Sequence, residues 1–145
     1  MTGIVLCALD VSQPAHETPV LRRAAQLAEL DQARLDVMTV LPDFGTSMVG
    51  SYFKADYHEH AVAEARKALG ELCEAVLGAE LNAQTRHIVS TGTVYEEVLR
   101  VARVDGAALI VIGSHRPALR DYLLGPNASR VVRHSDCSVF VVRDA

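Results

Sequence analysis

A stretch late in the chain carries residue types suited to binding a phosphate. Residues 111–132 read VIGSHRPALRDYLLGPNASRVV, with Gly113 directly after an apolar run and Gly125 directly before a segment of helical composition. A glycine lets a ligand approach the backbone closely, and the free N–H groups at a helix start attract anions. His115 and Arg116 add hydrogen-bond donors, and an arginine can bind a phosphate with two hydrogen bonds. The stretch is therefore a candidate anion-binding loop, although glycines between a strand and a helix also serve as simple turns.

Other reactive residue types have ordinary structural interpretations. Asp10 follows the first apolar run, where a carboxylate can act as a base but more often turns the chain. His58 and His60 point about 200° apart on a helix and cannot bind one metal ion together. Cys7 and Cys137 fall in apolar runs, where cysteine packs as a small core residue rather than acting as a nucleophile. We expect no metal site and no catalytic residue set.

The order of apolar and amphipathic segments decides where these residues lie. Nearly continuous apolar runs predict buried strands, and residues at helical spacing predict helices between them. The predicted strands are residues 3–9, 34–41, 83–90, 107–113 and 137–143. The predicted helices are residues 20–32, about 55–77, 91–106 and about 126–134. Residues 42–59 contain two glycines and a proline, and we expect a long functional or mobile loop there.

Helix ends are marked by specific residues. Thr93 is a predicted N-cap, and Glu96 three positions later completes a capping-box pattern. Gly106 is typical of a helix end, and Pro126 suits the first position of the last helix. The predicted third strand alternates apolar and polar residues, which favours a place near the sheet edge.

This alternation predicts a single α/β domain over residues 1–145. Its expected architecture is a doubly wound five-stranded parallel sheet with helices on both faces, in a flavodoxin-like or closely related strand order. Ligands of such sheets bind beyond the carboxyl ends of the strands, where the strand order reverses. That rule selects Asp10, Val40 with Leu41, and the stretch from Gly113 to Arg116.

Composition narrows the class of protein. The chain has 145 residues, 50% of them hydrophobic and 22% charged, with a formal net charge of -4. This acidic balance argues against a nucleic-acid binder. The start MTGIVLCALD lacks a basic region typical of signal peptides, and no apolar run reaches the roughly 20 residues of a membrane span. Three widely spaced cysteines predict neither a disulfide framework nor a zinc site. We expect a cytoplasmic protein with no nucleic-acid or membrane partner.

The motifs, taken in order, resemble the universal stress protein family. The resemblance runs from VLCALDVS near the start to SVFVVR near the end. Many ATP-binding members carry Gly-x-x-Gly, nine residues, then Gly-Ser or Gly-Thr after the fourth strand. Here Gly113-Ser-His-Arg116 is followed by eight residues and Gly125-Pro126-Asn127, similar to a subgroup with a Gly-Ser-His-Arg-Pro loop. The resemblance implies an adenine nucleotide alpha hydrolase-like fold that binds ATP, ADP or AMP, with or without Mg²⁺.

The resemblance also implies roles for three groups of residues, one for each part of the nucleotide. The group beside the adenine and ribose is Ala8, Leu9, Asp10 and Val40, with Val40 offering backbone hydrogen bonds. The group along the ribose and first phosphates is Ile112, Gly113, His115 and Arg116. The group at the later phosphates is Gly125, Pro126 and Asn127, with the start of the last helix.

Two residues depart from the ATP-binding signature. Arg116 replaces its second glycine, and Pro126 replaces a Ser or Thr, which removes a hydroxyl and a backbone N–H. We expect a stress-response sensor or regulator that binds an adenine nucleotide and acts on an unidentified protein. Two alternatives stay open: a nucleotide-free homodimeric interaction module, and an enzyme using Asp10 or His115. Without a clear base or a Walker lysine, any ATP hydrolysis should be slow.

The last strand is a candidate dimer contact. A terminal apolar strand at a sheet edge needs cover, and pairing with a second copy would supply it. The resemblance likewise implies a homodimer joined through this strand, Val139 to Arg143. The alternative is an edge protected only by Arg143 and Asp144.

Overall fold

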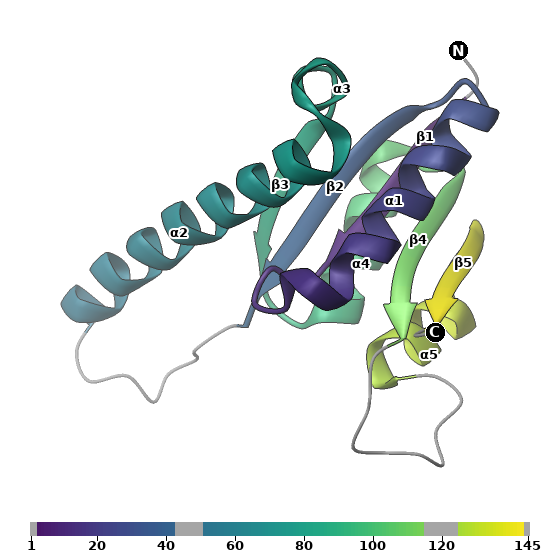
Figure 1. Ribbon diagram of the computed structural model, residues 1–145. Helices are drawn as coiled ribbons and strands as arrows, with labels where there is room; N and C mark the ends of the chain where they lie inside the picture. Colours follow the sequence, from purple (N-terminus) through teal and green to yellow (C-terminus); the bar gives the residue numbers. More distant parts are fainter. Residues whose placement is uncertain (1–2, 43–50, 115–124, 144–145) are drawn as a thin grey trace.

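Five apolar runs form a parallel sheet, and helices flank it on both faces (Figure 1). The computed structural model describes residues 3–42, 51–114 and 125–143. The strands are β1 (Ile4–Leu9), β2 (Arg34–Leu41), β3 (Arg86–Thr91), β4 (Leu109–Ser114) and β5 (Ser138–Arg143). The helices are α1 (Pro14–Leu30), α2 (Ser51–Leu77), α3 (Ala79–Ala83), α4 (Val94–Asp105) and α5 (Pro126–His134). The predicted doubly wound five-stranded parallel sheet is confirmed.

The strand order is β3-β2-β1-β4-β5. This is the beginning of the Rossmann order, whereas the flavodoxin order would place β2 at an edge. Residues 35–39 of β2 are buried, so this strand needs a neighbour on each side. The side chains of β3 are mostly half-exposed, and β3 occupies the edge as its alternating pattern predicts. Burial therefore decides between the two related orders.

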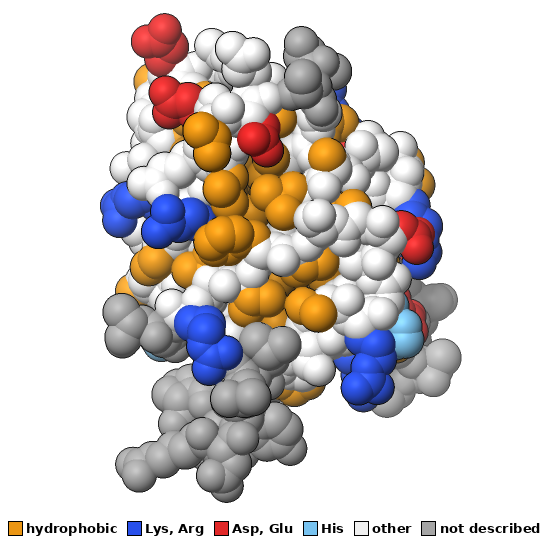
Figure 2. All heavy atoms as spheres, turned by 90° about the vertical axis from the view of Figure 1, so that its right-hand side faces the viewer, with side chains coloured by type: hydrophobic (Ala, Val, Ile, Leu, Met, Phe, Trp, Pro, Cys, Tyr) orange, Lys and Arg blue, Asp and Glu red, His pale blue; other side chains and the backbone are white. Residues whose placement is uncertain are grey.

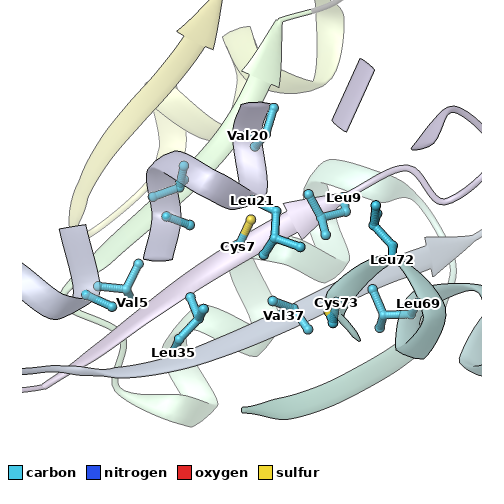
Figure 3. Close-up of a cluster of buried hydrophobic side chains, with 13 residues drawn as sticks. Val5, Cys7, Leu9, Val20, Leu21, Leu35, Val37, Leu69, Leu72 and Cys73 are labelled. Carbon is cyan, nitrogen blue, oxygen red and sulfur yellow. The ribbon is translucent and has the colours of Figure 1, made fainter. Parts of the chain in front are cut away.

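Two apolar clusters pack on opposite faces of the sheet. One joins Val5, Cys7 and Leu9 of β1 to α1 and α2 (Figure 3). The other joins Leu6 and Ala8 of the same strand to α4 and α5. Every residue of β1 is buried, so this strand is the centre of both clusters. Within the described ranges, no helix combines the length and apolar character that crossing a bilayer requires.

The cysteines belong to these clusters. Cys7 and Cys73 are fully buried in the first cluster, and Cys137 packs half-buried against the second. Burial raises the pKa of the Cys7 thiol well above its ordinary value and that of Cys73 to about 12. Both thiols therefore stay protonated near neutral pH. The core role predicted for Cys7 is confirmed.

Two helix starts differ from the sequence prediction, and one helix was not predicted. α1 begins at Pro14 rather than residue 20, because proline needs no hydrogen-bond partner for its nitrogen in a first helical turn. α2 begins at Ser51, so the predicted loop over 42–59 is wrong for residues 51–59, while residues 43–50 lie outside the described ranges. Between Ser51 and Gly70 the chain contains no glycine or proline that would end a helix. The short helix α3 was not predicted.

The predicted helix ends are mostly confirmed. Thr93 is the N-cap of α4, but its side chain makes no capping hydrogen bond. Gly106 ends α4 in the left-handed conformation, with φ of 69°, which glycine adopts without strain. Pro126 begins α5, as predicted.

Two buried carboxyl groups, those of Asp36 and Asp105, lie close to the amino ends of β2 and β3. Asp36 is fully buried and accepts hydrogen bonds from Arg34 at 3.0 and 3.2 Å. Asp105 at the end of α4 accepts one from Arg86 at 2.7 Å, and its Oδ2 is buried without a partner. Burial and the neighbouring Asp105 carboxyl raise the pKa of Asp36, despite the opposing effect of Arg34. A proton held by Asp36 would supply a donor next to the buried Asp105 Oδ2.

We predict that Asp36→Asn changes how stability depends on pH. The raised folded-state pKa means that Asp36 stabilises the fold fully below its ordinary pKa of 3.8, and that this contribution is lost as pH rises through the folded value. The asparagine keeps a donor for Asp105 and cannot ionise. Urea unfolding at a series of pH values from about 4 upward should show the variant gaining stability relative to wild type. A constant difference across the series would contradict the prediction.

Candidate functional site

A cavity of about 510 Å³ opens at the carboxyl ends of β1, β2 and β4. β1 and β4 are neighbours, and the chain leaves β1 toward β2 on one side and reaches β4 on the other. The connections after these two strands therefore diverge and leave a crevice between them, as expected at a reversal of strand order. The start of α5 closes another side of the same cavity.

The cavity brings together nine of the eleven residues predicted for the site. They are Ala8, Leu9, Asp10, Val40, Ile112, Gly113, Gly125, Pro126 and Asn127. The other two, His115 and Arg116, lie outside the described residues. Segments far apart in the sequence thus meet where the topology rule placed them.

The lining divides into an apolar inner part and a polar rim. Met38, Val98 and Ile112 are buried and line the cavity from β2, α4 and β4. Ser12 and Asn127 lie on the rim and carry hydrogen-bonding side chains. An apolar cleft with a few polar groups is the usual form of a small-molecule site, and it suits an aromatic base with a polar extension.

Asp10 shapes the turn that follows β1. Its Oδ1 accepts hydrogen bonds from the Ser12 backbone N–H at 3.0 Å and the Ser12 hydroxyl at 2.6 Å. The Gln13 N–H donates to the Asp10 carbonyl at 3.0 Å. An aspartate that bonds the backbone two residues on is a common turn device. The carboxylate therefore has the structural role considered more probable from the sequence.

Glu17 is a lining residue that the sequence prediction missed. It lies in the first turn of α1, is only 4% exposed, and its Oε1 accepts a hydrogen bond from the Asp10 N–H at 2.6 Å. After burial, the Glu17 carboxylate is the next largest cause of the raised pKa of Cys7. The sequence did contain a signal for this position. A proline followed by an acidic residue within one turn, as in Pro14 and Glu17, is typical of a helix start.

The entry to α5 has fewer free donors than a full phosphate loop. Gly125 is its N-cap, and the Gly125 N–H donates to the Ser114 hydroxyl at 3.1 Å. Pro126 has no N–H. The Ser129 N–H donates to the Gly125 carbonyl at 2.9 Å. Neither of these hydrogen bonds involves the first-turn N–H groups of Asn127 and Ala128. These two N–H groups are therefore the candidate donors for an anion at this helix start.

The described residues contain no group of three His, Cys, Asp or Glu side chains arranged to bind a metal ion. His58, one of the two histidines considered as ligands, instead lies 2.8 Å from the Thr91 hydroxyl at the end of β3. His60 lies 3.7 Å from Glu64 on the same helix. Both histidines lie on α2, and neither lines the cavity.

Comparisons with known proteins agree on one family. The family model described as "Universal stress protein family" matches residues 1–143. Universal stress protein A homolog 1 of Coxiella burnetii is 32% identical over 141 residues, covering 95% of this chain and 94% of the relative. The structure of UspA from Lactobacillus plantarum is similar with a TM-score of 0.78 at 21% identity, covering 98% of both chains. A universal stress protein described as a complex with cAMP has a TM-score of 0.66 at 19% identity, covering 99% of this chain and 98% of the other.

We predict that Asp10 contributes to stability through its turn rather than through catalysis. Asp10→Ala removes both hydrogen bonds to Ser12 and should lower the free energy of unfolding by about 1 kcal/mol. Asp10→Asn keeps an oxygen acceptor and should cost less. Urea denaturation of the two variants measures the difference. Equal losses would show that the turn does not need the acceptor.

Proposed function

Because this chain belongs to the universal stress protein family, we propose that it binds an adenine nucleotide in the cavity at the ends of β1, β2 and β4. The observation that carries the proposal is the meeting of nine predicted residues in one cavity. A volume of about 510 Å³ lies within the usual range for small-molecule sites. The neighbouring structure described as a cAMP complex supports an adenine ligand for this fold.

The cavity offers a distinct surface to each part of such a ligand. The adenine ring would pack against the apolar inner part, with the backbone of Val40 hydrogen-bonded to its edge. The ribose would lie near Asp10 and Gly113. The phosphates would meet Asn127 and the start of α5, where N–H groups and the helix dipole favour an anion. His115 and Arg116 remain proposed phosphate contacts.

Mg²⁺ would enter with the phosphates of ATP or ADP. This ion usually needs only one or two protein carboxylates and keeps several water ligands. Asp10 is the exposed carboxylate of the described lining and is the residue suited to that role. The bound Mg²⁺ would neutralise part of the negative charge of the phosphate groups.

We propose a regulatory rather than catalytic role for this binding, in the cytoplasm. In the described lining, Asp10 and Glu17 both accept hydrogen bonds from nearby protein donors, so neither is placed as a free base. Nucleotide binding would stabilise one conformation of the cavity rim. It would also stabilise one conformation of a surface that an unidentified partner protein binds. Stress-response sensing by nucleotide occupancy follows from that coupling.

Calorimetry with ATP, ADP and AMP, each with and without Mg²⁺, tests the proposed site. We predict submillimolar binding of at least one nucleotide by the wild type. Val40→Trp, which fills the cavity from β2, should weaken that binding at least about tenfold because the adenine loses its space.

Val104→Trp is the matched control, because Val104 is 79% exposed on α4 and does not line the cavity. It should bind like the wild type. Circular dichroism would verify that both variants fold. Absence of submillimolar binding by the folded wild type would reject the proposal and favour a nucleotide-free interaction module.

We further propose that β5 joins two copies into a homodimer. β5 is an edge strand of the sheet, and it reads Ser-Val-Phe-Val-Val-Arg, whereas the other edge, β3, begins with Arg86 and His87. Figure 2 shows hydrophobic side chains gathered in a band on this side of the molecule, with basic side chains around it. Phe140 on β5 is 39% exposed and Val132 on α5 is 45% exposed. A second copy of the same strand would cover this apolar edge.

Phe140→Glu should dissociate that dimer, because it places a charge in the proposed contact. Sedimentation equilibrium should give the wild type twice the chain mass of 15.7 kDa and shift the variant toward a single chain. Val104→Glu introduces the same charge at an exposed apolar position outside β5 and should stay dimeric. A monomeric wild type, or equal dissociation of both variants, would contradict the role of β5.

A further inference from the structure

A second cavity, of about 780 Å³, lies at the end of the sheet opposite the proposed nucleotide site. It is lined by Arg34, the first residue of β2, whereas Val40 near the end of the same strand lines the proposed nucleotide site. Extended backbone separates these two positions by about 20 Å. The second cavity lies between the end of α1, the start of β2, the end of α2 and the segment from α3 to β3, with α3 at the same end of the sheet as the start of β2 (Figure 1).

The floor of the second cavity is apolar. Ala28 and Leu35 are buried beneath it, and Val76 and Leu77 of α2 are half-buried along it. Leu81 of α3 lies beside them and is 39% exposed. The volume is within the usual range for small-molecule sites, and an apolar ligand body would remove this floor from water.

Hydrogen bonds hold α3 in place beside the cavity. The Asn82 amide nitrogen donates to Glu74 of α2 at 3.0 Å, and the Asn82 amide oxygen lies 2.8 Å from Nε2 of His87 on β3. The Thr85 hydroxyl donates to the Leu81 carbonyl at 2.9 Å. One side chain of α3 thus connects this helix to two neighbouring elements. A wall that is already ordered lowers the entropic cost of binding a ligand.

Gln32 lines the cavity in a strained conformation. Among the described residues it is the only non-glycine residue with a positive φ, which is 54°. Its N–H donates to the Glu29 carbonyl at 3.2 Å, and the Ala33 N–H donates to the Ala28 carbonyl at 2.8 Å. These hydrogen bonds form a helix end at which glycine is the usual residue. Retained backbone strain is more frequent at ligand sites than elsewhere, and here it places a long side chain on the cavity wall.

Two arginines lie among the polar lining residues. The Nε and Nη2 of Arg34 donate to Asp36 at 3.0 and 3.2 Å, so this guanidinium is already paired with a carboxylate of the protein. Arg22 is exposed on α1, about two turns before the helix ends. An arginine can bind a carboxylate with two parallel hydrogen bonds. The described lining combines these two arginines with one glutamate, Glu29, which matches a ligand with a single negative charge.

We propose that the second cavity binds a small amphipathic monocarboxylate, an organic acid with an apolar body. The apolar body would lie on Leu35, Val76 and Leu77, and the carboxylate would pair with Arg22. This proposal does not depend on nucleotide binding, because the described linings of the two cavities share no residue.

Octanoate is the probe that tests this proposal, and octanamide is the matched ligand without the charge. Titration of the ¹⁵N-labelled full chain with octanoate should give a Kd at or below about 1 mM. The largest amide shifts should occur at Ala25, Gln32, Leu77 and Gln84. Arg22→Gln should weaken octanoate binding about fivefold and change octanamide binding by less than about twofold, because only the carboxylate pairs with the arginine.

Arg66→Gln is the matched control, since Arg66 is an exposed arginine of α2 that does not line this cavity. It should bind both ligands like the wild type. Absence of octanoate shifts at this cavity in the folded wild type would overturn the proposal. Equal weakening by Arg22→Gln and Arg66→Gln, or equal weakening of octanoate and octanamide by Arg22→Gln, would overturn the pairing of the carboxylate with Arg22.

Gln32→Gly tests whether the strained residue serves the ligand. The glycine relieves the positive φ and removes the side chain from the cavity wall. The variant should unfold at a urea concentration no lower than the wild type does, while octanoate and octanamide each bind about threefold more weakly. Wild-type affinity in the variant would overturn the role of Gln32 in binding.

Discussion

Burial of β1 on both faces is the constraint on which the rest of the structure depends. All of its side chains are buried, and they alternate between the clusters under α1 and α2 and under α4 and α5. Such a strand cannot form an edge, so β2 and β4 must pair with it on either side. Because the chain runs outward from β1 to β3 before it returns to β4, the connections diverge beside β1. The cavity follows from that divergence.

The same constraint brings a carboxylate to the cavity. Only a few residues connect Leu9 of β1 to Pro14 of α1, so the first turn of α1 lies close to the strand end. Asp10 forms the turn through Ser12, and its own N–H donates to Glu17. The hydrogen bonds that stabilise this connection therefore lie beside the proposed ligand site.

Much of the fold could be predicted from the sequence because β1 and β4 consist largely of consecutive apolar residues, and because Gly106 and Pro126 mark helix ends. Asp10, Val40 and Gly113 were located at the cavity by the strand-end rule, whereas Ala8, Leu9, Ile112, Pro126 and Asn127 were implied by the resemblance to the family. The start of α1 was predicted less accurately. Pro14 and Pro19 are residue types typical of turns, and the sequence alone does not show that both belong to a helix. Glu17 was missed because a glutamate on an amphipathic helix usually faces water, and its partner is a backbone N–H seven residues away.

A ¹⁵N-labelled titration with AMP, followed residue by residue through backbone amide shifts, tests the location of binding most directly. The account predicts that the largest shifts occur at the carboxyl ends of β1, β2 and β4 and at the start of α5, including Asp10, Val40, Gly113 and Asn127. A second cavity of about 780 Å³ lies between the end of α1 and the end of α2, lined by Gln32, Val76 and Leu81 among others. Shifts centred there, or no shifts at the strand ends, would contradict the account.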